Sequence, residues 1–192
     1  MSIEVGTPTY VNMYLVNTPE LGINAATAGL IVAVYWALMM VGRFVGASIG
    51  SKVSSRAMLT TVSIATLILV SFGMFAPTDI TVSVPGIDWA NLKLIWANVP
   101  VGIFAFLLVG LCTSVMWGGI FNMAVEGLGK YTAAASGIFM TMVFGCAVML
   151  FIQAQVAEMT DYMTSYWVVL FCAAYLLFYA LVGRHSKSRD NH

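Results

Sequence analysis

Charged residues are scarce in this sequence, and hydrophobic residues dominate it. Only 8% of the 192 residues are Asp, Glu, Lys or Arg, whereas 60% are hydrophobic and the mean hydropathy is +0.92. Soluble domains average roughly 25% charged residues, so this composition excludes an ordinary soluble domain and indicates a membrane protein. The formal net charge is zero, which gives no indication of a nucleic-acid partner.

Cysteine and histidine are also rare. Cys112, Cys146 and Cys172 lie far apart, each inside an apolar run without a His or carboxylate at metal-ligand spacing, so we expect buried packing residues rather than disulfides or metal ligands. His185 and His192 are in the polar tail, and no Ser/His/Asp arrangement occurs. The sequence therefore predicts neither an enzyme nor a bound cofactor. The N-terminal stretch MSIEVGTPTY has no basic region and no cleavage site, so it is not a secretory signal.

Five apolar runs are long enough to cross a bilayer, which takes about 20 residues each. They are Ala25–Gly50, Ala57–Ala76, Leu94–Val125, Ala133–Ala157 and Thr164–Gly183. Residues 1–17 have a helical pattern but are too short to span alone, as though the first half of the helix were missing. The third run is longer than needed, and the proline in NVPVG is expected to bend or cap it.

The remaining segments are polar. PTDITVSVPGIDWANLK, between the second and third runs, reads as an ordered loop outside the membrane, and residues 184–192 form a polar tail. We therefore predict an all-α membrane protein with a single bundle over residues 1–192. It has five full transmembrane helices plus a partial N-terminal one.

The basic residues fall mainly on one side of the membrane if the five runs alternate in direction. Lys93 alone lies opposite the other seven, which are Arg43, Lys52, Arg56, Lys130, Arg184, Lys187 and Arg189. The excess of Lys and Arg marks the cytoplasmic side. We expect a multi-pass protein of the cell inner (plasma) membrane with its C-terminus, after residue 184, in the cytoplasm.

One basic residue, Arg43, directly follows an apolar run and raises the question of what solvates its charge. An arginine facing hydrocarbon costs about 3 kcal/mol even on the lenient insertion scale. Glycines at intervals of four surround it, which lets another helix approach closely. One interpretation is plain helix packing with ordinary cytoplasmic anchors. The other is a cytoplasmic gate formed by Gly42, Arg43, Gly46, Lys52 and Arg56.

Three stretches resemble one known family. VYWALMMVGRFVGASIGSKVSSRAML resembles the eighth helix and following loop of the fucose:proton symporter branch of the major facilitator superfamily, which includes glucose/galactose transporters. FNMAVEGLGKYTAAASGIF resembles the loop between its tenth and eleventh helices, and IEVGTPTYVNMYLVN the latter half of its seventh. The resemblance runs over the whole chain, and GRF-x-G together with EGLGK-x-T carries its specificity.

The resemblance implies a twelve-helix fold in two bundles, of which this chain matches only the second. It implies transport of a hexose or fucose-type sugar with a proton or other coupling cation, by alternating access around a site between the bundles. The partners expected are membrane lipid, the sugar, the coupling cation and an N-terminal six-helix bundle encoded elsewhere. The chain is then a truncation or one piece of a split gene. The alternative is a non-transporting membrane interaction subunit or an inactive remnant.

Polar side chains within the spans are the candidates for sugar contact. Glu4 is the one carboxylate expected deep in the bilayer, and Gln153 ends a stripe of small residues that starts at Gly137. Amides serve hydroxyl donors and acceptors alike, and aromatic rings cover the apolar face of a sugar. The substrate-binding set predicted here is Glu4, Asn12, Trp36, Asn122 and Gln153. The alternative is that these residues pack helices or face lipid.

Overall fold

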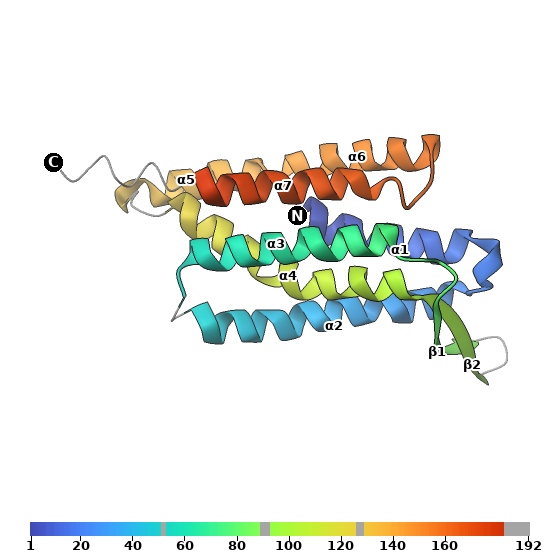
Figure 1. The fold of residues 1–192 in the computed structure, drawn as a ribbon. Helices are drawn as coiled ribbons and strands as arrows, with labels where there is room; N and C mark the ends of the chain where they lie inside the picture. The colour runs from blue at the N-terminus through green and yellow to red at the C-terminus, as the bar shows by residue number, and fades with distance from the viewer. Residues whose placement is uncertain (51–52, 89–92, 126–128, 183–192) are drawn as a thin grey trace.

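The helices pack around α4 (Val101–Val125), which carries more of the buried residues than any other described helix. The computed structural model describes residues 1–50, 53–88, 93–125 and 129–182. In Figure 1, α4 lies between α2 (Ala25–Gly50) and α3 (Ser55–Phe75). Phe106 of α4 is fully buried and stacks on Tyr166 at a ring-centroid distance of 4.1 Å. These contacts make α4 the axis of the bundle.

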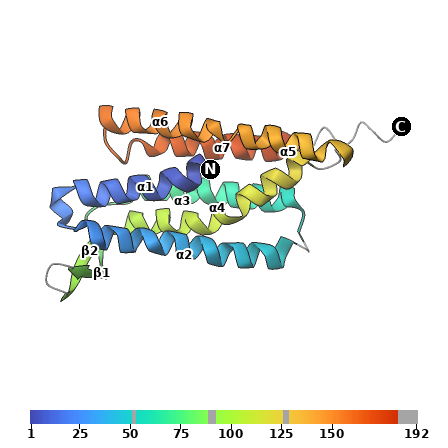
Figure 2. The same ribbon diagram turned by 180° about the vertical axis from the view of Figure 1, so that it is seen from behind.

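The remaining helices form a second layer. The helices α6 (Phe144–Met159) and α7 (Tyr166–Val182) run side by side along the edge opposite α2, as both views show (Figures 1 and 2). Helix α1 (Ser2–Asn17) contacts α2, α4, α6 and α7. Its 16 residues are roughly 24 Å long. It starts part-way along the bundle (Figure 1), and Glu4 belongs to its first turn.

The chain reverses direction at two ends of the bundle. A 3-10 turn, Pro19–Leu21, follows α1 at the end that carries the hairpin of β1 (Thr81–Asp88) and β2 (Lys93–Pro100). The other end holds the start of α3, the 3-10 turn Gly129–Tyr131 and the start of α5 (Thr132–Thr141). Arg56 and Lys130, predicted to be cytoplasmic, belong to this second end.

Four helical stretches in the described part are long and apolar enough to cross a membrane: Ala25–Gly50, Ser55–Phe75, Val101–Val125 and Gly129–Met159. Helix α7 is apolar but has 17 residues. With α1 as the partial helix, this arrangement confirms the predicted all-α membrane fold.

The span predicted from Leu94 begins at Val101 instead. The residues before Val101 form β2, which pairs antiparallel with β1 so that Pro100 lies opposite Thr81. The segment expected to be a polar loop therefore contains β1, the first strand of a hairpin. The reason is a period of two: Ala97 and Val99 are buried, whereas Trp96 and Asn98 are exposed. An apolar run that alternates in this way suits a strand, and Pro100 ends it.

The helix predicted over residues 133–157 is interrupted at Met142 and Val143. The hydrogen bonds there follow the 3-10 pattern instead of the α-helical one. The N–H groups of Val143, Gly145 and Cys146 each donate to the carbonyl three residues earlier. This break divides the span into α5 and α6. Of these two helices, α5 has no buried residue.

Candidate functional site

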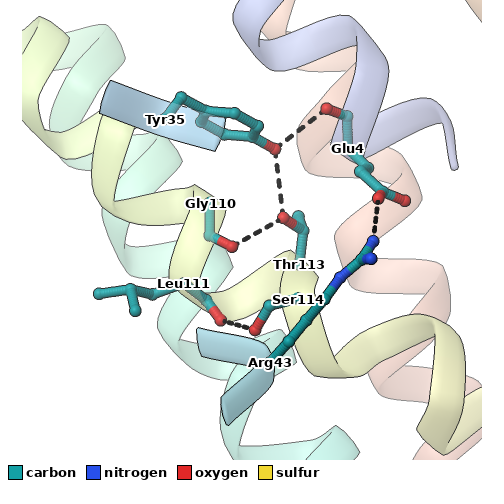
Figure 3. Close-up of polar contacts among 7 residues, drawn as sticks. All are labelled: Glu4, Tyr35, Arg43, Gly110, Leu111, Thr113 and Ser114. Carbon is teal, nitrogen blue, oxygen red and sulfur yellow. Dashed lines mark hydrogen bonds and ion pairs between the residues drawn. The ribbon is translucent and has the colours of Figure 1, made fainter. Parts of the chain in front are cut away.

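Arg43 forms an ion pair with Glu4, across the contact between α2 and α1. Its Nη2 lies 3.6 Å from Oε1 of Glu4 (Figure 3). The Glu4 side chain is 13% exposed and that of Arg43 is 62% exposed. Arg43 stands seven residues before the end of α2, roughly 10 Å along the helix. Arg43, predicted to belong to a gate, and Glu4, predicted to contact the sugar, therefore contact each other.

Pro8 explains why a tyrosine joins this pair. Proline has no N–H, so the Glu4 carbonyl, four residues before Pro8, has no helical donor. The hydroxyl of the fully buried Tyr35 donates to this carbonyl at 3.0 Å. A freed backbone group inside a membrane must find such a partner. The Tyr35 hydroxyl is this partner, and it links α2 to α1 at the carbonyl that Pro8 leaves without a helical donor.

Thr113 of α4 completes the network, as Figure 3 shows. Its Oγ1 lies 3.2 Å from the Tyr35 hydroxyl and 3.1 Å from the carbonyl oxygen of Gly110. Each hydroxyl carries one hydrogen, so two hydrogens serve three contacts: those to Glu4, to Gly110 and between the hydroxyls. One contact is therefore left without its hydrogen at any moment.

Close helix contacts position this network. A Cβ on Gly110 would lie 2.7 Å from the Tyr35 carbonyl oxygen, and one on Gly42 would overlap the side chain of Ser114. A Cβ on Gly46 would likewise overlap a side chain of α4, that of Val115. The small residues around Arg43 therefore pack α2 against α4, which agrees with the packing interpretation and holds Arg43 in place.

Gln153 is buried in a different contact, between α6 and α1. It is 1% exposed, and a Cβ on Gly6 would lie 2.6 Å from its Oε1. Its Nε2 has no hydrogen-bond partner, nor has Oγ1 of the neighbouring buried Thr7. The carbonyl of Thr7 accepts from the Tyr166 hydroxyl at 2.8 Å. This α1–α6 contact therefore holds unused hydrogen-bonding capacity.

The other predicted residues are spread out. Trp36 is 43% exposed and its ring meets that of Tyr35 edge to face at 5.5 Å. Asn12 is half-buried with an unpartnered Oδ1, Asn122 is exposed near the end of α4, and Arg56 is half-buried in the first turn of α3. Lys52 lies outside the described residues, as do residues 126–128 and the predicted tail 184–192.

Sequence reasoning missed Tyr35 and Thr113. A signal for Tyr35 exists in the sequence, because Pro8 in a membrane helix requires a donor for the Glu4 carbonyl. Nothing in the sequence says which helix supplies that donor. No feature of the sequence marks Thr113 except its position next to Ser114.

The chemistry of the network is that of binding rather than catalysis. It offers a carboxylate acceptor, a guanidinium donor and two hydroxyls, with an aromatic ring beside them. The described residues contain no group of three His, Cys, Asp or Glu side chains that could hold a metal. Such a set suits a neutral, hydroxyl-rich ligand.

Comparison with known proteins identifies the fold. No protein-family profile matches the chain. The crystal structure of FucP, a major facilitator superfamily transporter in the outward conformation, matches with a TM-score of 0.74 and 19% identity over 95% of this chain and 40% of that one. The protein therefore has the fold of one half of a major facilitator superfamily transporter.

The relatives found by sequence are named for the sugars that they transport. Two relatives from Brucella abortus, of biovar 1 strain 9-941 and of strain 2308, are named glucose/galactose transporter. Each is 28% identical over 188 residues, which cover 96% of this chain and 40% of the relative. The chain thus spans less than half the length of these proteins. The predicted resemblance to the C-terminal part of such transporters is confirmed, and the relatives are transporters rather than enzymes.

Proposed function

We propose that this chain is the C-terminal bundle of a hexose or fucose-type sugar transporter that is coupled to a proton or another cation. An N-terminal six-helix bundle completes it, and alternating access moves the sugar between the two. The protein lies in the inner membrane with its C-terminus in the cytoplasm. The observation that supports the proposal most is the Glu4–Arg43 pair, because charged side chains within a membrane bundle mark substrate or ion pathways.

The pair and its neighbours match the chemistry of a sugar. Glu4 accepts hydrogen bonds from sugar hydroxyls, and Trp36 covers an apolar ring face. Arg43 is the more exposed partner, so it can exchange Glu4 for another acceptor without leaving α2. Glu4 is also the candidate proton acceptor, because binding a proton would remove the charge that holds Arg43.

The gate is proposed at the same helix. Gly42 and Gly46 hold α2 close to α4, and Arg43 is held by Glu4 in this conformation. If the pair forms in one conformation only, Arg43 acts on the rate of the conformational change. Lys52 and Arg56 are then the cytoplasmic part of that gate.

Gln153 belongs to the proposed wall in a second conformation. Because it is buried against Gly6, a sugar reaches its amide only when α6 separates from α1. Its unpartnered Nε2 then gains an acceptor. Asn12 and Asn122 complete the proposed set at the two ends of the path.

The test is a chimera in which this chain replaces the matching 40% of the Brucella abortus glucose/galactose transporter. We expect uptake of radiolabelled glucose or galactose into proteoliposomes, and stimulation by an imposed cation gradient. Gln153→Leu should weaken sugar binding about tenfold, because a buried unpaired group costs about 1–3 kcal/mol. Gln155→Leu is the matched control, since Gln155 is exposed on the same helix. A folded chimera that binds no sugar refutes the proposal and favours a membrane interaction subunit.

A further inference from the structure

A cavity with polar walls lies at the end of the bundle that carries the hairpin in Figure 1. It has a volume of about 340 Å³ and lies between the 3-10 turn Pro19–Leu21 and strand β2. Its walls include Glu20, Gly22, Thr81, Trp96 and Asn98. Sites for small molecules measure about 300–1,000 Å³, so this volume suits a ligand with a single ring. Neither Glu4 nor Gln153 lines the cavity, which is therefore separate from the contacts described above.

The free edge of β2 supplies backbone hydrogen-bonding groups on this side. The N–H of Val101 donates to the Ile80 carbonyl at 2.9 Å, and bonded and non-bonded pairs alternate along the hairpin from there. In this alternation the N–H and C=O groups of Trp96 and Asn98 point away from β1. Pro85, which lies opposite Trp96, fits the pattern because it has no N–H to donate. The turn contacts β2, so these groups face the space between the two.

Three side chains add the groups that recognise a sugar. The Oδ1 of Asn98 accepts from the Ser83 hydroxyl at 2.8 Å, which fixes the amide and leaves its N–H groups as donors. Glu20 is exposed and forms no ion pair with any residue that the structure describes, so its carboxylate is free to accept hydrogen bonds. Trp96 is 70% exposed and offers an aromatic face. Donors, acceptors and one aromatic face together suit a neutral ring that carries hydroxyl groups.

Both walls of the cavity are held in place. In the turn, the N–H of Leu21 donates to the Thr18 carbonyl at 3.1 Å, and Gly22 has a φ of 57°, which glycine adopts without strain. The hairpin packs directly on the start of α2, because a Cβ on Gly86 would lie 2.5 Å from the Thr27 hydroxyl. A ligand therefore has few groups to order when it binds, which favours its affinity.

We propose that this cavity binds one neutral hexose, with the sugar ring against Trp96 and its hydroxyls bonded to Glu20, Asn98 and the edge of β2. A hard cation fits less well, because calcium takes six to eight oxygen ligands and the cavity holds one carboxylate. The choice of ligand rests on the proposed function. In the proposed orientation this end faces away from the cytoplasm, so the cavity is an outer site that holds sugar before it reaches the site between the bundles.

The experiment measures glucose binding to the purified full chain in lipid nanodiscs by saturation-transfer NMR. The chain carries Gln153→Leu throughout, which removes one proposed contact of the inner site. We expect millimolar binding, weakened at least about fivefold by Trp96→Leu and by Glu20→Gln. Trp96→Phe keeps an aromatic face and should retain most of the affinity. Trp167→Leu and Glu158→Gln are the matched controls, because both residues are exposed and neither lines the cavity.

A second measurement on the unaltered chain guards against misfolded variants. Glucose should slow the oxidation of Trp96 by N-bromosuccinimide and leave that of Trp167 unchanged, as read by peptide mass. Equal protection of the two tryptophans, absence of glucose binding, or binding that neither Trp96→Leu nor Glu20→Gln weakens would overturn the proposal. These results would leave transport by the chimera standing. Conversely, a chimera that fails to transport, beside binding that depends on Trp96 and Glu20, would refute the proposed function and leave the outer site.

Discussion

Replacing Tyr35 by Phe removes the donor that compensates for Pro8. The Glu4 carbonyl then has neither a helical N–H nor the hydroxyl that lies 3.0 Å away. Leaving a buried acceptor unpaired costs about 1–3 kcal/mol. In a chain of this size each kcal/mol shifts Tm by roughly 2–4 °C, so Tyr35→Phe should lower Tm by roughly 2–12 °C. The assay is thermal unfolding in detergent, followed by circular dichroism.

A second substitution tests the cause rather than the size of this effect. Pro8→Ala restores an N–H that can donate to the Glu4 carbonyl, so Tyr35→Phe should cost markedly less in the Pro8→Ala background. Tyr175→Phe, at an exposed tyrosine of α7, is the control and should change Tm little. The reasoning fails if Tyr35→Phe costs the same with and without Pro8, or no more than the control.

Three further predictions follow from other contacts. Gly110→Ala should be less stable than Gly118→Ala by about 1–3 kcal/mol in thermal unfolding, because only the first Cβ meets a neighbouring backbone and both gain the same helix propensity; equal stability would show that α2 and α4 adjust freely. A double-mutant cycle of Glu4→Gln and Arg43→Gln should give a coupling of at most about 1 kcal/mol, because the exposed Arg43 side chain is screened; several kcal/mol would mean a buried pair. A reporter fused after His192 should be active in the cytoplasm, and activity only outside would invert the orientation.

The helices could be predicted from the sequence because bilayer thickness sets the length of an apolar run. Two boundaries could not. Leu94–Pro100 is mostly apolar, as a membrane helix is. Its pairing with β1 and the alternate burial of residues 96–99 show that it is a strand. No proline lies near the break at Met142, so the sequence gives no sign that the helix is interrupted there.

The candidate site was predictable as single residues but not as a pair. Arg43 and Glu4 each stand out, because a charge within an apolar helix needs a partner. That they partner each other depends on the distance and rotation of α1 against α2, to which the hydrogen bond from Tyr35 to the Glu4 carbonyl contributes.

Two of the helix contacts that carry polar groups, α2–α4 and α1–α6, differ in how easily they open. Between α2 and α4, the Tyr35 hydroxyl lies 3.2 Å from Oγ1 of Thr113 and glycines bring the backbones together, so separation would lose both contacts. Between α1 and α6, the Tyr10 hydroxyl donates to the Leu150 carbonyl at 3.4 Å, but Nε2 of Gln153 has no partner, and an unpaired buried group costs about 1–3 kcal/mol. Water or a sugar hydroxyl admitted there would satisfy this amide, which offsets part of the cost of separating the helices. The α5–α6 break supplies a hinge on the same span. Of these two contacts, the one between α1 and α6 therefore opens at the lower cost.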